Sequence, residues 1–309
     1  MTLPAFSSFP SADEHFTVAT ADGARLPVYG LRGPKDAPAL LFGHANGLAA
    51  GSYAPWLARL ARHAHVFAFD ARGHGGAEWP EGPLATVFAD NRMAEDVLAV
   101  TQAVAARLPQ TPLTYVGHSL GAVAALRLLT LGAQPGWRAF IAFEPPVFPP
   151  PSAPIYAQAI ERQDRLLSGT LRRRALWSDP EALYERLAAR GPFARADAAM
   201  LMAHCRATLR PDGEGGYRLA CPPVVEAAIF ERHRHADTWS RLDRLAAPVE
   251  LIGSDPTTAE NDWVSRAMPE IAGRLPQGRL TVVPETGHML IFEAPDRCAA
   301  LVLERLDGR

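Results

Sequence analysis

The sequence predicts an α/β protein: a mostly parallel sheet flanked by helices, with a mainly helical segment inserted. Two observations carry this prediction. Strand-length apolar runs alternate with helical patterns from about residue 15 to residue 144, and the same alternation returns after about residue 248. Strands that alternate with helices favour parallel pairing, because each crossover connection places a helix on a face of the sheet. The 309 residues suffice for one large domain with an insertion.

The first half of the chain supplies most of the expected sheet. Apolar runs of strand length, bounded by turn residues, are expected to form strands at 15–20, 25–30, 39–44, 66–70, 113–119 and 139–144. Helical spacing of apolar residues predicts a helix over 88–108, which stops before Pro109, and an apolar helix over 120–132 that ends at Gly132. After the insertion, strands are expected at 248–254 and 279–284, with helices at 263–275 and 295–306.

A proline cluster marks where the chain leaves the sheet. Six of the ten residues from 145 to 154 are proline, which continues neither a sheet ladder nor a helix interior. Helical candidates and one hairpin-like segment, 210–219, follow. We therefore expect residues 1–144 and 248–309 to form one domain, and residues 145–247 to form a helical cap inserted into it.

The amino-acid composition limits the kinds of molecule that the protein is expected to bind. Thirty-one basic and thirty-three acidic residues give a net charge of −2, which argues against nucleic acid and anionic membranes and favours a small-molecule substrate. Cys205, Cys221 and Cys298 are scattered, without the close pairs of a zinc site or a disulfide framework. No metal or cofactor is expected. The first residues lack a secretory pattern, so a cytoplasmic location is expected. The oligomeric state, monomer or homodimer, stays open.

The segment Gly117-His118-Ser119-Leu120-Gly121 is the strongest catalytic signal. It lies between a predicted strand and a predicted helix, where glycines on both sides of a serine permit a tight turn that exposes the hydroxyl. Ser119 is therefore the candidate nucleophile. A serine hydroxyl is weakly nucleophilic at neutral pH, so this role requires a base and an oxyanion stabiliser.

The base and the oxyanion donors have candidates in other loops. His288 follows the predicted strand 279–284, at the edge of the sheet where ligands bind in open α/β folds. Leu120, directly after the nucleophile, would provide one backbone N–H for the oxyanion. The loop after the strand that begins at residue 39 would provide the second, from Asn46.

Five segments together resemble α/β-hydrolase-fold serine hydrolases with a cap domain. They occur in that family's order and span nearly the whole chain from about Leu40: FGHANG, DARGHG, GHSLG, PVELIGSD and ETGHMLIFEAP. The resemblance implies structural roles for Asp70, Arg72 and His74 of the second segment. A bacterial subgroup of hydrolases also resembles this chain in three segments: FGHANG, LRRRALW and CPPVVEAAIF. This resemblance indicates which proteins are related to the chain more than it indicates the substrate.

The acid of the triad has two main candidates. Relatives commonly place it in a G-x-x-D pattern after the strand that follows the cap, and here Asp255 is the preferred candidate although its spacing from Gly253 is one residue shorter. Other relatives use an acid at the end of the strand before the cap, where this chain has Glu144; Asp262 is a weaker alternative. Either carboxylate could hold the tautomer of His288 and stabilise its imidazolium form.

The expected activity is hydrolysis of an ester-like bond in a carboxylic ester, thioester or lactone. Carbon–carbon bond hydrolysis and acyl transfer could use the same groups, and a ligand-binding protein without catalysis could share the fold. The run Arg172 to Arg174 could receive a substrate carboxylate, although a solvated helix face is the commoner explanation of such a run.

Overall fold

The protein is built on one eight-stranded sheet. The computed structural model describes residues 6–257 and 263–306, and its strand order is β1-β2-β4-β3-β5-β6-β10-β11. The strands from β4 to β11 in this order pair in parallel, whereas β2 pairs antiparallel with both β1 and β4. The strand bounds are β1 Glu14–Ala19, β2 Arg25–Leu31, β3 Ala39–Gly43, β4 His65–Phe69, β5 Leu113–His118, β6 Ala139–Phe143, β10 Val249–Ser254 and β11 Gly278–Val283.

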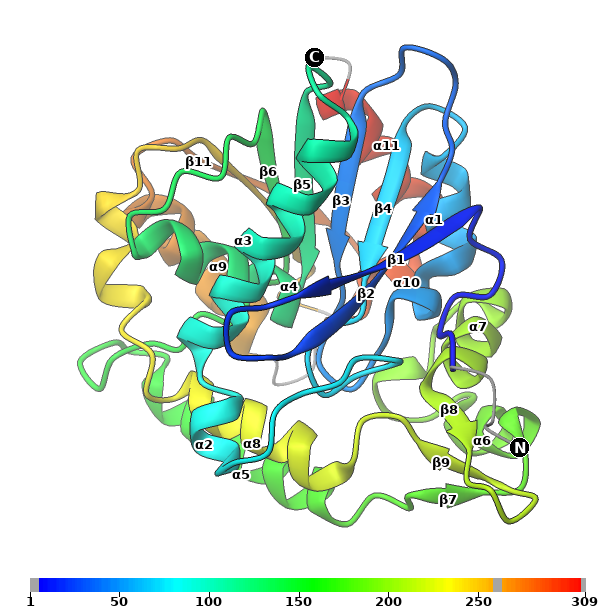
Figure 1. Ribbon diagram of the computed structural model, residues 1–309. Coiled ribbons are helices and arrows are strands. Elements are labelled where there is room, and N and C mark those ends of the chain that lie inside the picture. Colours follow the sequence, from blue (N-terminus) through cyan, green and yellow to red (C-terminus); the bar gives the residue numbers. More distant parts are fainter. Residues whose placement is uncertain (1–5, 258–262, 307–309) are drawn as a thin grey trace.

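Helices cover both faces of this sheet (Figure 1). One buried apolar cluster joins the sheet to α3 (Asp90–Arg107), α4 (Leu120–Thr130) and α9 (Trp263–Arg274). A second cluster, on the other face, joins it to α1 (Ala54–Leu60) and α11 (Pro295–Leu306). The predicted fold class is therefore confirmed: the central strands β3 and β5 are buried along their whole length, because helices cover both faces of the sheet.

The chain leaves the sheet after β6 and returns to it at β10. The elements from α5 to α8 lie together at the lower edge of the molecule in Figure 1, and α7 packs against the short helix η1 of the core. A small sheet of order β7-β9-β8 accompanies the helices, with the antiparallel pair β8/β9 at the hairpin-like segment. Their bounds are α5 Tyr156–Leu171, β7 Leu176–Trp177, α6 Pro180–Leu187, η2 Gly191–Phe193, α7 Ala198–Thr208, β8 Leu209–Pro211, β9 Tyr217–Leu219, α8 Pro223–His233 and η3 Trp239–Arg244; the remaining short helices are η1 Ala50–Tyr53, α2 Leu84–Val87 and α10 Leu290–Glu293.

No helix within residues 6–257 and 263–306 combines the length and apolarity needed to cross a bilayer.

Arg72 anchors the loop after β4 through a buried ion pair. Its guanidinium, only 1% exposed, donates two hydrogen bonds of 2.6 Å to the carboxylate of Asp96 and further bonds to Asp22. The hydrogen bond from Arg72 lowers the pKa of Asp22 well below its usual value. These contacts join the loop to α3 and to the β1–β2 turn.

Replacing Arg72 with methionine should lower the free energy of unfolding by about 3–5 kcal/mol, because it leaves the Asp96 carboxylate buried without its partner. The matched control is Arg25→Ala, which breaks an exposed pair with Glu78 and should cost less than about 1 kcal/mol. Urea denaturation of both variants measures the difference. Equal losses of unfolding free energy in the two variants would show that the buried Arg72–Asp96 pair stabilises the fold no more than an exposed pair does.

Two buried histidines should make stability pH-dependent. Burial lowers the pKa of both His74 and His204 to about 3, from an ordinary value of 6.5. As pH falls below 6.5, the unfolded chain binds these protons while the native state does not until about pH 3. Stability is therefore lost on acidification across this window, by about 1.4 kcal/mol per pH unit for each histidine.

Urea titrations at pH 7 and pH 5 measure this loss. His204→Asn keeps a polar group near Ser52 Oγ, which lies 3.3 Å from the histidine Nδ1, but removes one titrating group. The variant should lose less stability between the two pH values than the wild type does. An unchanged loss would contradict the assignment of His204 as neutral in the native state.

Candidate active site

Ser119 occupies a strained turn between β5 and α4. Its backbone angles are φ 50° and ψ −109°, a conformation that L-residues rarely adopt. The glycines on either side make the turn possible, because a Cβ on Gly117 would lie 2.5 Å from the amide nitrogen of Ala122 and one on Gly121 would lie 2.2 Å from the carbonyl oxygen of Gly43. The Ser119 side chain therefore stands at the carboxyl end of β5, as the sequence pattern predicts.

A continuous hydrogen-bonded chain links Ser119 to a buried acid. The Nε2 atom of His288 lies 3.1 Å from Ser119 Oγ, and its Nδ1 atom lies 3.2 Å from Glu144 Oε2. Glu144 is fully buried, and its other oxygen accepts a 2.6 Å hydrogen bond from the Ser254 amide. The geometry is that of a nucleophile, a base and an acid that orients the base.

This arrangement corrects the preferred choice of acid. The Asp255 carboxylate accepts hydrogen bonds from Thr257 N–H (2.8 Å) and Oγ1 (2.6 Å) and from Glu285 N–H (3.1 Å), so it braces the two loops that follow β10 and β11. The place beside His288 Nδ1 belongs to the alternative candidate, Glu144. The third candidate, Asp262, lies outside the described residues.

The two predicted oxyanion donors lie at the same end of the sheet. Leu120 is the first residue of α4, where backbone N–H groups have no partner within the helix, and Asn46 follows β3. In residues 6–257 and 263–306 no hydrogen-bond acceptor is found for the backbone N–H of either residue. The Asn46 side chain donates a 3.0 Å hydrogen bond to the carbonyl oxygen of Glu226 in α8, which fixes this loop against the inserted segment. Their role as oxyanion donors stays a prediction.

His118 connects the candidate loops, and sequence reasoning missed it. Ala45 N–H donates to the Tyr53 hydroxyl (3.3 Å), which donates to His118 Nδ1 (2.6 Å), and His118 Nε2 donates to the carbonyl oxygen of His288 (2.9 Å). Burial, with a smaller contribution from His288, lowers the pKa of His118 to about 3, which fits this neutral tautomer. No spacing in the sequence indicates the partner Tyr53, because the contact joins residues 65 positions apart.

The arginines of the run from Arg172 to Arg174 have different surroundings. Arg173 forms an ion pair with the buried carboxylate of Glu226, whose pKa is raised by burial. The Arg174 guanidinium lies over the ring of Trp177, 4.5 Å from its centroid. Arg172 is exposed. These contacts leave the predicted carboxylate-binding role untested.

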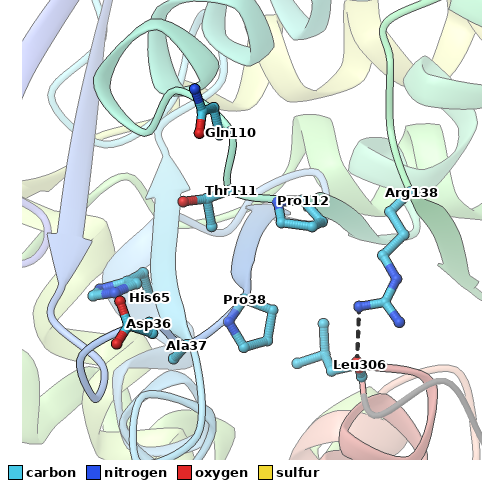
Figure 2. Close-up of a pocket in the computed structure, with 9 residues that line it drawn as sticks. All are labelled: Asp36, Ala37, Pro38, His65, Gln110, Thr111, Pro112, Arg138 and Leu306. Atoms are coloured by element: carbon cyan, nitrogen blue, oxygen red, sulfur yellow. Dashed lines mark hydrogen bonds between the residues drawn. The ribbon is translucent and has the colours of Figure 1, made fainter.

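A separate surface groove lies at the opposite end of the sheet (Figure 2). It measures about 560 Å³ and is lined by residues at the amino ends of the central strands, including Pro38, His65 and Pro112. At one side of it, Arg138 donates a 3.1 Å hydrogen bond to the carbonyl oxygen of Leu306. None of its lining residues belongs to the Ser119 site. In the part of the chain that the structure describes, no three histidine, cysteine or carboxylate side chains form a metal-binding group.

Several solved structures share this fold. An E-2-(acetamidomethylene)succinate hydrolase superposes with a TM-score of 0.75 at 21% identity, over 95% of this chain and 100% of that chain. An esterase from Thermogutta terrifontis, solved with malate bound, gives 0.67 at 19% identity, over 96% and 98%. The thioesterase domain from the curacin biosynthetic pathway gives 0.69 at 19% identity, over 94% and 99%.

A search of curated protein sequences found no match. The sequence profile of one family, described as the alpha/beta hydrolase family, matches residues 40–301. This range holds β3, the Ser119 turn, the inserted segment and the His288 loop. The chain therefore belongs to the α/β hydrolase family.

Proposed function

We propose that this chain is a serine hydrolase that cleaves an ester-like bond of a small molecule, in a carboxylic ester, thioester or lactone. The observation that carries the proposal is the unbroken chain of contacts from Ser119 Oγ through His288 to the buried Glu144. The esterase and the thioesterase domain of the same fold support this class of substrate.

In the proposed reaction, His288 Nε2 takes the hydroxyl proton as Ser119 Oγ attacks the substrate carbonyl carbon. The backbone N–H groups of Leu120 and Asn46 stabilise the negative charge on the carbonyl oxygen. His288 then gives the proton to the leaving group, which departs and leaves an acyl-enzyme. A water molecule, activated by the same histidine, releases the acid and restores Ser119. This sequence of steps uses protein groups and water alone.

Glu144 has two tasks in this scheme. Its Oε2 atom accepts a hydrogen bond from His288 Nδ1–H, which keeps the proton on Nδ1 and leaves Nε2 free to act as the base. Its negative charge also stabilises the imidazolium that forms during attack. Because Glu144 is fully buried, little water screens this interaction.

We assign residues 145–247 to a cap over the site, with residues 1–144 and 248–309 as the catalytic domain. Contacts from this segment reach two of the proposed catalytic loops: α8 holds the Asn46 side chain, and Arg195 contacts the His288 loop. The cap would thereby take part in shaping the site as well as in covering it.

Ser119→Ala should abolish covalent labelling by a fluorophosphonate probe and reduce hydrolysis of an activated ester by at least about 10³-fold, because no other group replaces the nucleophile. Mass spectrometry of the labelled protein and p-nitrophenyl ester assays measure the two effects. The exposed Ser240→Ala is the matched control and should be labelled like the wild type. A folded wild type that the probe does not label would favour a ligand-binding protein over an enzyme.

Glu144→Gln should lower kcat for the same ester by about 10²–10⁴-fold, because the amide cannot stabilise the imidazolium of His288. When the glutamine oxygen accepts the Ser254 amide, its NH2 group faces His288 Nδ1, so the loss should combine the missing charge with the wrong histidine tautomer. Asp255→Asn, compared in parallel, should stay within about threefold of the wild type. The opposite ranking of the two variants would restore Asp255 as the acid.

A further inference from the structure

Side chains from other segments hold several backbone polar groups of the loop that carries His288. Asp255 accepts a hydrogen bond from the N–H of Glu285, and His118 donates one to the carbonyl oxygen of His288. Between these two ends, Glu293 accepts a 3.0 Å hydrogen bond from the N–H of Gly287. A loop that follows a strand end has few ladder bonds of its own, so side chains define its position.

One of these contacts reaches the loop from the cap. Arg195 lies between η2 and α7, and its guanidinium donates to the carbonyl oxygen of Glu285 (2.9 Å) while it pairs with the Glu293 carboxylate (2.7 Å). The same carboxylate oxygen of Glu293 accepts the Gly287 N–H. Arg195 and Glu293, which pair with each other, thus hold the Glu285 carbonyl and the Gly287 N–H, just before His288. We call this pair of side chains the clamp.

The neighbouring contacts dock this cap segment firmly. The N–H of Asp197 donates a 2.8 Å hydrogen bond to the carbonyl oxygen of Phe292 in α10, and the rings of Phe193 and Phe292 meet with centroids 5.7 Å apart. The clamp also fits closely, since a Cβ on Gly287 would lie 3.1 Å from Glu293 Oε1 and 3.3 Å from Arg195 Nη2.

We propose that Arg195 and Glu293 are positioning residues for His288, so that docking of the cap sets the place of the general base. This inference rests on the proposed function. Glu293 is only 6% exposed and Arg195 is 47% exposed. Both side chains direct hydrogen bonds to the backbone just before His288: Arg195 to the Glu285 carbonyl oxygen and Glu293 to the Gly287 N–H. Small displacements of a catalytic group are costly in rate, because proton transfer from Ser119 requires a well-aligned contact.

Kinetics of Arg195→Met and Glu293→Gln test the proposal. Each variant should lower kcat for an activated ester by about tenfold and leave KM within about twofold, since the clamp touches the base loop and not the proposed oxyanion donors. The double variant should be no worse than either single variant, because both residues act on one loop. Arg195→Lys should restore part of the loss, because lysine can pair with Glu293 but lacks the fork that also reaches the Glu285 carbonyl.

Glu250→Gln is the matched control. Glu250 pairs with Arg305 across 3.0 Å between β10 and α11, and the two side chains are 11% and 27% exposed. This variant should keep the wild-type kcat. Equal losses in Glu250→Gln, or wild-type kcat in both clamp variants, would overturn the proposal.

Amide hydrogen exchange of the folded protein gives a readout that does not depend on activity. Peptides covering residues 284–289 should exchange faster in Arg195→Met and Glu293→Gln than in Glu250→Gln. The side chain that accepts the Gly287 N–H loses its negative charge in Glu293→Gln and its ion-pair partner in Arg195→Met, so that hydrogen bond is weakened in both variants. Unchanged exchange would overturn the clamp. Faster exchange in a protein whose Ser119 the fluorophosphonate probe fails to label would support the clamp and contradict the proposed hydrolase.

Discussion

The close approach of α4 to β3 is the constraint on which the site depends. The backbone at Gly121 lies so near Gly43 that a single Cβ would overlap a carbonyl oxygen, and the Gly121 amide donates a 3.0 Å hydrogen bond to the carbonyl oxygen of His44. This hydrogen bond holds the first turn of α4 against the carboxyl end of β3. Ser119 is consequently held at a positive φ, with the loop of Asn46 directly alongside. The strained conformation of Ser119 persists because the hydrogen bonds of the Ser119 and Gly121 amides fix the backbone of this turn.

Glu144 is fully buried, directly after Phe143, whose carbonyl oxygen accepts a 2.9 Å hydrogen bond from the Ser119 amide. An isolated carboxylate in a protein interior is strongly disfavoured, and it is retained where hydrogen bonds replace its water. Ser254 N–H and His288 Nδ1 supply such bonds here, one to each oxygen. The acid is thereby fixed in one orientation, which in turn selects the tautomer of the histidine.

The inserted segment joins the site at two separate points. On one side, Asn46 is tied to α8 next to the ion pair of Glu226 with Arg173. On the other, Arg195 and Glu293 hold the loop of His288. Between them runs the buried path from Tyr53 through His118 to the carbonyl oxygen of His288. We infer from these contacts that the positions of the proposed oxyanion donors and of the proposed base depend on the docking of the cap.

The sequence by itself determined the fold class, the strained serine turn and the loops of Asn46 and His288, because each depends on local patterns of glycines and strand ends. It left two acids open, since Glu144 and Asp255 follow β6 and β10, which are neighbours in the sheet. The tertiary contacts distinguish their places. Phe143, the last residue of β6, pairs with Ile252, whereas β10 continues two residues further to Ser254. Glu144 therefore leaves the sheet earlier than Asp255 does, at φ 46°, and its side chain contacts His288. Contacts such as Arg195 with Glu293 likewise join distant segments, and the tertiary structure alone brings them together.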